Sequence, residues 1–166
     1  MDDIRIVLAE ERHAEGLRTA YEDICRERVY FSVLQAPPLD TIVRHIQTLH
    51  QTGGVHYVAV VDHDRVVGWC DVTRNAREIE SHAGSLGMGL LREYRRQGVG
   101  RRLAEAALQH AVALGFERVE LGVYASNEAA VALYKKLGFV TEGVKRRARK
   151  LDGEFTDKLM MAVLFN

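Results

Sequence analysis

The residues with the clearest chemical potential form a short glycine-bearing loop with flanking arginines, Arg95-Arg96-Gln97-Gly98-Val99-Gly100-Arg101. The loop follows an apolar run and opens a long amphipathic stretch, which predicts the order strand, loop, helix. Backbone N–H groups at the start of a helix lack intrahelical partners, and the helix dipole adds partial positive charge there. Glycine lets such a backbone approach an anion without a Cβ in the way. The loop therefore predicts a site for a pyrophosphate-containing cofactor.

The composition is that of one neutral domain. The 166 residues include 23 Lys and Arg and 23 Asp and Glu, and this length predicts a single domain over residues 1–166. Neutrality argues against bulk electrostatic capture of nucleic acid or an anionic membrane. Cys25 and Cys70 lack metal-ligand spacing, so we expect reduced thiols and no metal site. We find no apolar signal segment and no run near the ~18 residues that span a bilayer, which predicts a soluble, cytoplasmic protein.

Periodicity and turn residues predict a mixed α/β fold around the loop. We expect helices over Glu10 to Tyr30 and after a capping Asp40, and a third over Val99 to Leu114 with Leu114 facing inward. Asn127 is a good cap for a short fourth helix that ends before Gly138. The expected strands are Ile4 to Leu8, Val55 to Val61, Arg65 to Val72, Ser81 to Leu91, Arg118 to Ala125, Phe139 to Lys150 and Phe155 to Phe165.

Three motifs in the C-terminal half carry a family resemblance. They are Tyr94-Arg95-Arg96-Gln97-Gly98-Val99-Gly100-Arg101-Arg102-Leu103, Leu121-Gly122-Val123 with Asn127, and Ala132-Leu133-Tyr134-Lys135-Lys136-Leu137-Gly138-Phe139. Together with the element order they resemble the GNAT superfamily of acyl-CoA-dependent N-acetyltransferases. The stretches 30–37 and 81–87 resemble a GNAT subfamily that acetylates the α-amino group of free amino acids. The resemblance implies the GNAT fold, a mixed sheet of about seven strands with about four helices, and acetyl-CoA as the acetyl donor.

The resemblance also implies how acetyl-CoA is held. Backbone amides of residues 95–101 would bind the pyrophosphate, while Arg96, Arg101 and Arg102 could add charge near the 3′-phosphate. The fourth strand of the family bulges and splays, and Met88, Gly89 and Leu90 occupy the matching positions. Gly89 suits a bulge. The N–H of Leu90 would polarise the thioester carbonyl, and Asn127 would contact the pantetheine arm.

Proton transfer needs an acid and a base. By resemblance, Tyr134 protonates the departing CoA thiolate, because a phenol with a pKa near ~10 can serve a thiolate of comparable basicity. Many relatives carry a glutamate base where this chain has Gly122. Glu120 lies on the same strand face by period-2 spacing, and Glu80 and His82 are further candidates. A water chain without a single base stays open beside them.

The acceptor side is less specified. Tyr30, Phe31, Leu34 and Gln35 are candidates for substrate contact, because the family lines its acceptor pocket with this region. Alternation along a strand predicts that a basic cluster of the terminal hairpin, Lys145, Arg147 and Arg149, shares one face. That face could hold a substrate carboxylate, contact the partner in a homodimer, or remain a solvated edge protected by charge.

Three functions fit the sequence. The leading hypothesis is an acetyl-CoA-dependent N-acetyltransferase acting on the primary amine of a small molecule, a free amino acid or an amino-acid-like compound. The first alternative is a protein N-terminal or lysine acetyltransferase. The second, of another class, is an acyl-CoA-binding sensor without catalysis.

Overall fold

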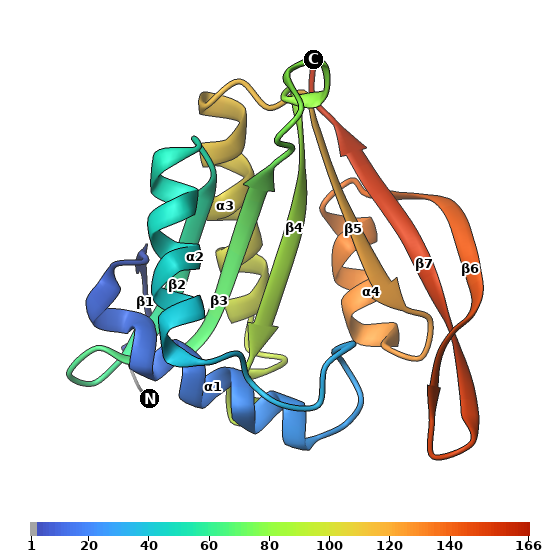
Figure 1. The fold of residues 1–166 in the computed structure, drawn as a ribbon, viewed down its shortest axis with the longest axis horizontal. Coiled ribbons are helices and arrows are strands. Elements are labelled where there is room, and N and C mark those ends of the chain that lie inside the picture. The colour runs from blue at the N-terminus through green and yellow to red at the C-terminus, as the bar shows by residue number, and fades with distance from the viewer. Residues whose placement is uncertain (1–2) are drawn as a thin grey trace.

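Seven strands form one mixed sheet in the computed structural model, which describes residues 3–166 (Figure 1). The strands are β1 Arg5–Leu8, β2 Val55–Val61, β3 Arg65–Arg74, β4 Ala83–Leu90, β5 Arg118–Tyr124, β6 Val140–Leu151 and β7 Glu154–Leu164. Their order is β1-β2-β3-β4-β5-β7-β6. The β4–β5 pair is parallel and all other pairs are antiparallel. This confirms the expected mixed sheet.

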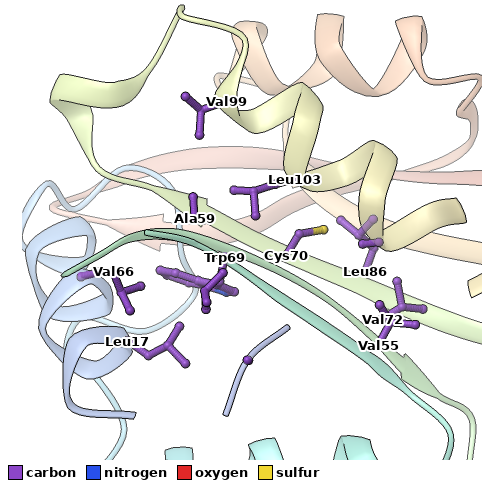
Figure 2. Close-up of a cluster of buried hydrophobic side chains, with 14 of the residues drawn as sticks. Leu17, Val55, Ala59, Val66, Trp69, Cys70, Val72, Leu86, Val99 and Leu103 are labelled. Carbon is purple, nitrogen blue, oxygen red and sulfur yellow. The ribbon is translucent and has the colours of Figure 1, made fainter. Parts of the chain in front are cut away.

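Four α-helices flank the sheet within the described residues. They are α1 Ala14–Arg26, α2 Leu39–Gln51, α3 Val99–Ala113 and α4 Glu128–Lys136. Figure 2 shows Trp69 of β3 with Leu17 and Val66 on the side of α1, and Leu103 on the side of α3. Both faces of the central strands are therefore covered, which explains why β2 and most of β3 are buried.

The parallel strands β4 and β5 diverge after a short contact. They pair from Ala83↔Arg118 to Ser85↔Glu120, and Figure 1 shows them separating beyond that point with α4 nearby. The N–H of Leu91, just after β4, donates to Val67 O on β3 at 2.9 Å. The odd-numbered residues of β4 therefore direct their backbone N–H and C=O groups toward β3. By alternation, Met88 and Leu90 direct theirs toward the diverging side. No strand within residues 3–166 pairs with them there.

The ends of three elements differ from the sequence prediction. α1 ends at Arg26, and the left-handed Arg28 (φ 57°) leads the chain into a loop that carries Tyr30. The N-cap of α2 is Pro38; Asp40 lies in the first turn and pairs with Arg44 at 3.2 Å. β4 begins at Ala83, because a 3₁₀ turn over Glu78–Glu80 precedes it.

Two expected packing patterns were wrong. The β3–β4 register runs without a shift from Gly68↔Leu90 to Arg74↔Gly84, so Gly89 forms no bulge. A Cβ at Gly89 would instead overlap the Trp69 ring, which gives the glycine a packing reason. Leu114 is 39% exposed rather than inward, because α3 ends one residue before it.

The terminal hairpin departs from simple alternation as well. The β6–β7 register shifts between Lys145 and Arg149, and Arg147 between them is left-handed with φ 51°. The three basic residues therefore do not share one regular face. Arg149 packs over the Tyr124 ring at 4.2 Å and donates to Val29 O at 2.7 Å, so its charge serves a contact within the chain.

Candidate active site

A first cavity of about 560 Å³ lies beside the diverging end of β4. Its lining comes from β4, the glycine loop, α4 and the end of α1 with its following loop: Ile24, Tyr30, Phe31, Met88, Gly89, Leu90, Arg95, Arg96, Gly98, Gly100, Arg101, Asn127, Ala129, Ala130, Ala132, Leu133, Tyr134 and Lys136. The structure thus brings together most of the residues predicted to hold the cofactor. Gln97 and Val99 are not in this lining: the Gln97 amide donates to Glu93 O, and Val99 is buried in the core.

The glycine loop forms an open helix start. Gly98 is the N-cap of α3 in the left-handed conformation (φ 79°), and it provides no side-chain cap. The first N–H groups of α3 therefore keep their hydrogen-bonding capacity for another partner. A Cβ at Gly98 would meet nothing within 4 Å, whereas one at Gly100 would lie 3.5 Å from Met88 Cε and 3.6 Å from Leu133 Cδ2. Backbone can approach an anion closely at both positions.

The arginines around the loop have different roles. Arg95 turns to the protein: it bonds Glu27 at 2.5 Å, donates to Leu90 O at 2.9 Å and stacks over Tyr30. Arg102 also points away from the cavity, since it donates to Ile4 O. Arg96 and Arg101 line the cavity. Of the three arginines expected to add charge, these two remain in place to do so.

Tyr134 is the buried hydroxyl of the first cavity. It is 6% exposed, and its ring lies 5.6 Å from that of Phe139. Burial raises the pKa of the Tyr134 phenol well above its usual value, so the group is protonated at physiological pH and is a weaker acid than an exposed phenol. Asn127 lines the same cavity while its Oδ1 accepts from the Ala130 N–H at 3.3 Å; the predicted helix cap is confirmed.

The sequence-predicted bases line neither this cavity nor the second one described below. His82 is exposed just before β4 begins, at the end opposite Leu90. Glu120 is held by Arg118 at 2.9 Å, and Arg118 is shared with Glu142. Glu80 lies in an exposed 3₁₀ turn with Arg77 within 3.7 Å. Because none of the three residues lines either cavity, none is placed to accept a proton from a substrate bound there.

The space beside Gly122 holds a side chain that the sequence did not indicate. A Cβ there would lie 2.5 Å from Lys158 Cε. The Lys158 chain on β7 therefore crosses the space that a side chain at position 122 would use. Its ammonium also lies 5.5 Å from the Tyr124 ring. A cation takes the place where many relatives carry a carboxylate.

A second cavity, of about 390 Å³, adjoins the first on the α1–α2 side of the sheet. Phe31 and Met88 line both cavities. The other lining residues of the second cavity are Leu17, Tyr21, Pro37, Thr41, Ile42, His45, His56, Trp69, Asp71 and Gly87. Tyr21 stacks on Phe31 at 4.8 Å and on Trp69 at 5.1 Å, which makes one wall apolar and aromatic.

Of the residues predicted to contact substrate, Phe31 lines both cavities and Tyr30 lines only the first; the sequence prediction missed the polar groups of the second cavity. Leu34 and Gln35, predicted to contact substrate, are exposed and line neither cavity. The missed groups are His45, His56 and Asp71. One signal was available: Trp69 and Asp71 alternate with buried Cys70, which places both on one face of a strand.

No helix within residues 3–166 is long and apolar enough to span a membrane. The same range contains no group of three or more His, Cys, Asp or Glu side chains arranged to hold a metal ion.

Comparison with known proteins identifies relatives along the whole chain. Residues 17–139 match the family model described as the Acetyltransferase (GNAT) family. The L-amino acid N-acetyltransferase AaaT of Escherichia coli K12 is 29% identical over 163 residues, covering 98% of each chain. The N-alpha-acetyltransferase RimI of Mycobacterium tuberculosis is 33% identical over 59% of this chain and 60% of its own. A structure of yncA from Salmonella typhimurium with its cofactor acetyl-CoA shares the fold, with a TM-score of 0.91, 14% identity and coverage of 99% and 95%.

Proposed function

Because the chain belongs to the GNAT acetyltransferase family, we propose that it moves the acetyl group of acetyl-CoA to the primary amine of a small molecule, a free amino acid or an amino-acid-like compound. The observation that carries the small-molecule acceptor is the second cavity of about 390 Å³, which meets the first cavity at Phe31 and Met88. The likeness to an L-amino acid N-acetyltransferase over 98% of both chains supports it.

The first cavity fits acetyl-CoA. The uncapped start of α3, with open space at Gly98, suits the pyrophosphate, and Arg96 and Arg101 add positive charge beside it. Met88 offers its backbone groups on the free side of β4 to the amide groups of the pantetheine arm. Asn127 lines the same cavity. When bound, acetyl-CoA supplies an acetyl group activated as a thioester.

The chain's own groups account for the rest of the chemistry. The Leu90 N–H faces the diverging side of β4, where it can donate to a carbonyl oxygen as negative charge develops. The Tyr134 phenol lines the first cavity, where it can donate its proton to a departing sulfur. The apolar contacts of Tyr134 with Phe139 hold the ring in one orientation.

A direct assay tests the proposal. The protein is mixed with acetyl-CoA and a panel of free amino acids, other small primary amines and peptides, and release of free thiol is followed. We expect turnover on one or more free amino acids. Turnover on peptides alone would replace the small-molecule function by protein N-terminal or lysine acetylation. The similarity to the mycobacterial RimI supports this alternative. Binding of acetyl-CoA without turnover on any amine would point to a sensor.

A further inference from the structure

The second cavity contains polar groups for which the family motifs give no role. Asp71 extends from β3, and its carboxylate lies 3.4 Å from His45 Nε2 on α2. His56 on β2 lies directly opposite Asp71 in the register. All three line the same cavity, although they come from three separate elements. Such a cluster on an otherwise apolar, aromatic surface needs a functional explanation.

His56 is the most buried polar member of the cluster. The residue is 5% exposed, and neither ring nitrogen has a hydrogen-bond partner within residues 3–166. Burying an unpartnered polar group is costly. A buried imidazole beside Asp71 is therefore a feature that core packing alone does not explain.

Asp71 is open toward the cavity. Its side chain is 15% exposed, and within residues 3–166 its side-chain hydrogen-bond contact is His45. The neighbour across the strands is Gly87, where an added Cβ would lie 3.4 Å from Asp71 Oδ1. Because position 87 has no side chain, the space beside this carboxylate stays available.

We propose that the second cavity is the acceptor site, in which Asp71 binds the ammonium group of a primary amine with an apolar body and the His45–Asp71 pair accepts its proton. This inference rests on the proposed function and names its acceptor residues. The apolar body would contact the aromatic wall formed by Tyr21, Phe31 and Trp69.

The position of His45 suits proton release. Its side chain is 43% exposed, so it stands at the mouth of the cavity. The hydrogen bond that His45 makes to the Asp71 carboxylate raises the pKa of His45, which makes the imidazole a stronger base. The other titratable groups lining the cavity are His56 and Tyr21, while the neighbouring Arg44 is occupied within its own helix.

The proposed step balances in atoms and charge. The ammonium gives one proton to the His45–Asp71 pair, and the imidazole carries it to solvent. The neutral nitrogen forms a C–N bond to the acetyl carbonyl carbon while the C–S bond breaks. The second nitrogen proton replaces the one that Tyr134 donates to the leaving sulfur. The products are an N-acetyl amide, free thiol and one proton.

Steady-state kinetics of the full chain test the assignment with Asp71→Asn, His45→Gln and Gly87→Ala. We expect kcat/KM for leucine-like amines to fall about 100-fold in the first two, and KM for the amine to rise in the third. Acetyl-CoA affinity should not change in any of them. The deficit of His45→Gln should shrink above about pH 9.5, where more of the amine is already neutral in solution. The matched control is His50→Gln, on the same helix and outside both cavities.

The outcomes separate the two proposals. If amines turn over but Asp71→Asn and His45→Gln keep wild-type kcat/KM, or if His50→Gln loses as much, the acceptor assignment is overturned and the proposed function stands. If no amine turns over, the proposed function fails, and NMR of the histidine C2 protons decides the site separately. Addition of leucinamide without acetyl-CoA should then shift the His45 and His56 resonances of the wild type and not those of Asp71→Asn; unshifted resonances would overturn the site itself.

Discussion

Arg95 of the glycine loop forms an ion pair with Glu27, at the C-terminal end of α1, with Nη2 2.5 Å from Oε1. The two side chains are 24% and 23% exposed. The same guanidinium donates to Leu90 O and to the Tyr30 hydroxyl. One side chain thus connects the end of β4, the glycine loop and the segment that follows α1.

The first prediction concerns this pair. Arg95→Met and Glu27→Gln should each lower the free energy of unfolding by about 1–3 kcal/mol, because each leaves a partly buried charge or acceptor without its partner. The double variant should lose less than the sum. Urea unfolding of the four proteins in the cycle measures the coupling. Strictly additive losses would show that the contact contributes nothing by itself.

The second prediction concerns the anion site. Gly98→Glu should abolish acetyl-CoA binding in isothermal titration, because it places a negative side chain beside the helix start. Gly115→Glu is the control for backbone strain, since Gly115 is also left-handed (φ 84°) with open space around it and lies at the other end of α3. Retained affinity in Gly98→Glu would refute the loop assignment.

The third prediction concerns the acid. Tyr134→Phe should lower kcat about 100-fold with little change in acetyl-CoA affinity, because the ring and its contact with Phe139 remain. Tyr57→Phe is the matched control: its hydroxyl contacts His110, and it lines neither cavity. Unchanged kcat in Tyr134→Phe would assign protonation of the sulfur to solvent.

The fourth prediction concerns Gly89. Gly89→Ala should lower the free energy of unfolding by about 1–3 kcal/mol. The new methyl group would overlap the Trp69 ring, and relieving that overlap requires the ring or the strand to shift from its packed position. Gly143→Ala, where a Cβ meets nothing within 4 Å, should stay close to wild type. Denaturant midpoints compare the two. Equal stability of both variants would mean that Trp69 repacks freely.

The fifth prediction concerns pH. Burial lowers the pKa of His56 to about 4 from an ordinary 6.5. The unfolded chain therefore binds the proton more readily between those values, and stability that is present above pH 6.5 is lost as pH falls toward 4. From pH 7 to pH 5 this group should cost about 2 kcal/mol. His56→Leu should remove that part of the slope in urea titrations at the two pH values.

Two other histidines contribute to the dependence of the free energy of unfolding on pH. Burial lowers the pKa of His13 as well, so His13 adds a loss in the same direction. Asp71 raises the pKa of His45, which opposes it. A slope in His56→Leu as steep as in the wild type would mean that His56 is not the group responsible.

Local features of the chain were predictable from the sequence, since they depend on near neighbours. The left-handed Gly98, the Asn127 cap and the placement of Tyr134 on a short helix follow from backbone requirements and helical period. The ends of α1 and α2 were less predictable. A left-handed Arg28 ends the first, and Pro38 rather than Asp40 begins the second.

The reasons for two glycines lie far away in the chain. Gly89 is required by Trp69 on the neighbouring strand, and the space at Gly122 is taken by Lys158 on β7. Strand pairing alone brings these residues together. The family resemblance indicates only that position 122 lacks the expected glutamate. The structure shows that the Lys158 side chain occupies the space beside it.

The sequence by itself determined the fold class of this protein and predicted its donor side, because a strand, a glycine loop and a helix start are contiguous and their local backbone geometry suits an anion. Only the tertiary structure brought together the residues of the proposed acceptor side. His45 lies on α2, His56 on β2 and Asp71 on β3. No single helical or strand repeat of the sequence relates the three positions. They meet because α2 packs over β2 and β3. Residues that come together only through such packing have no fixed spacing in the sequence, so no motif reveals them.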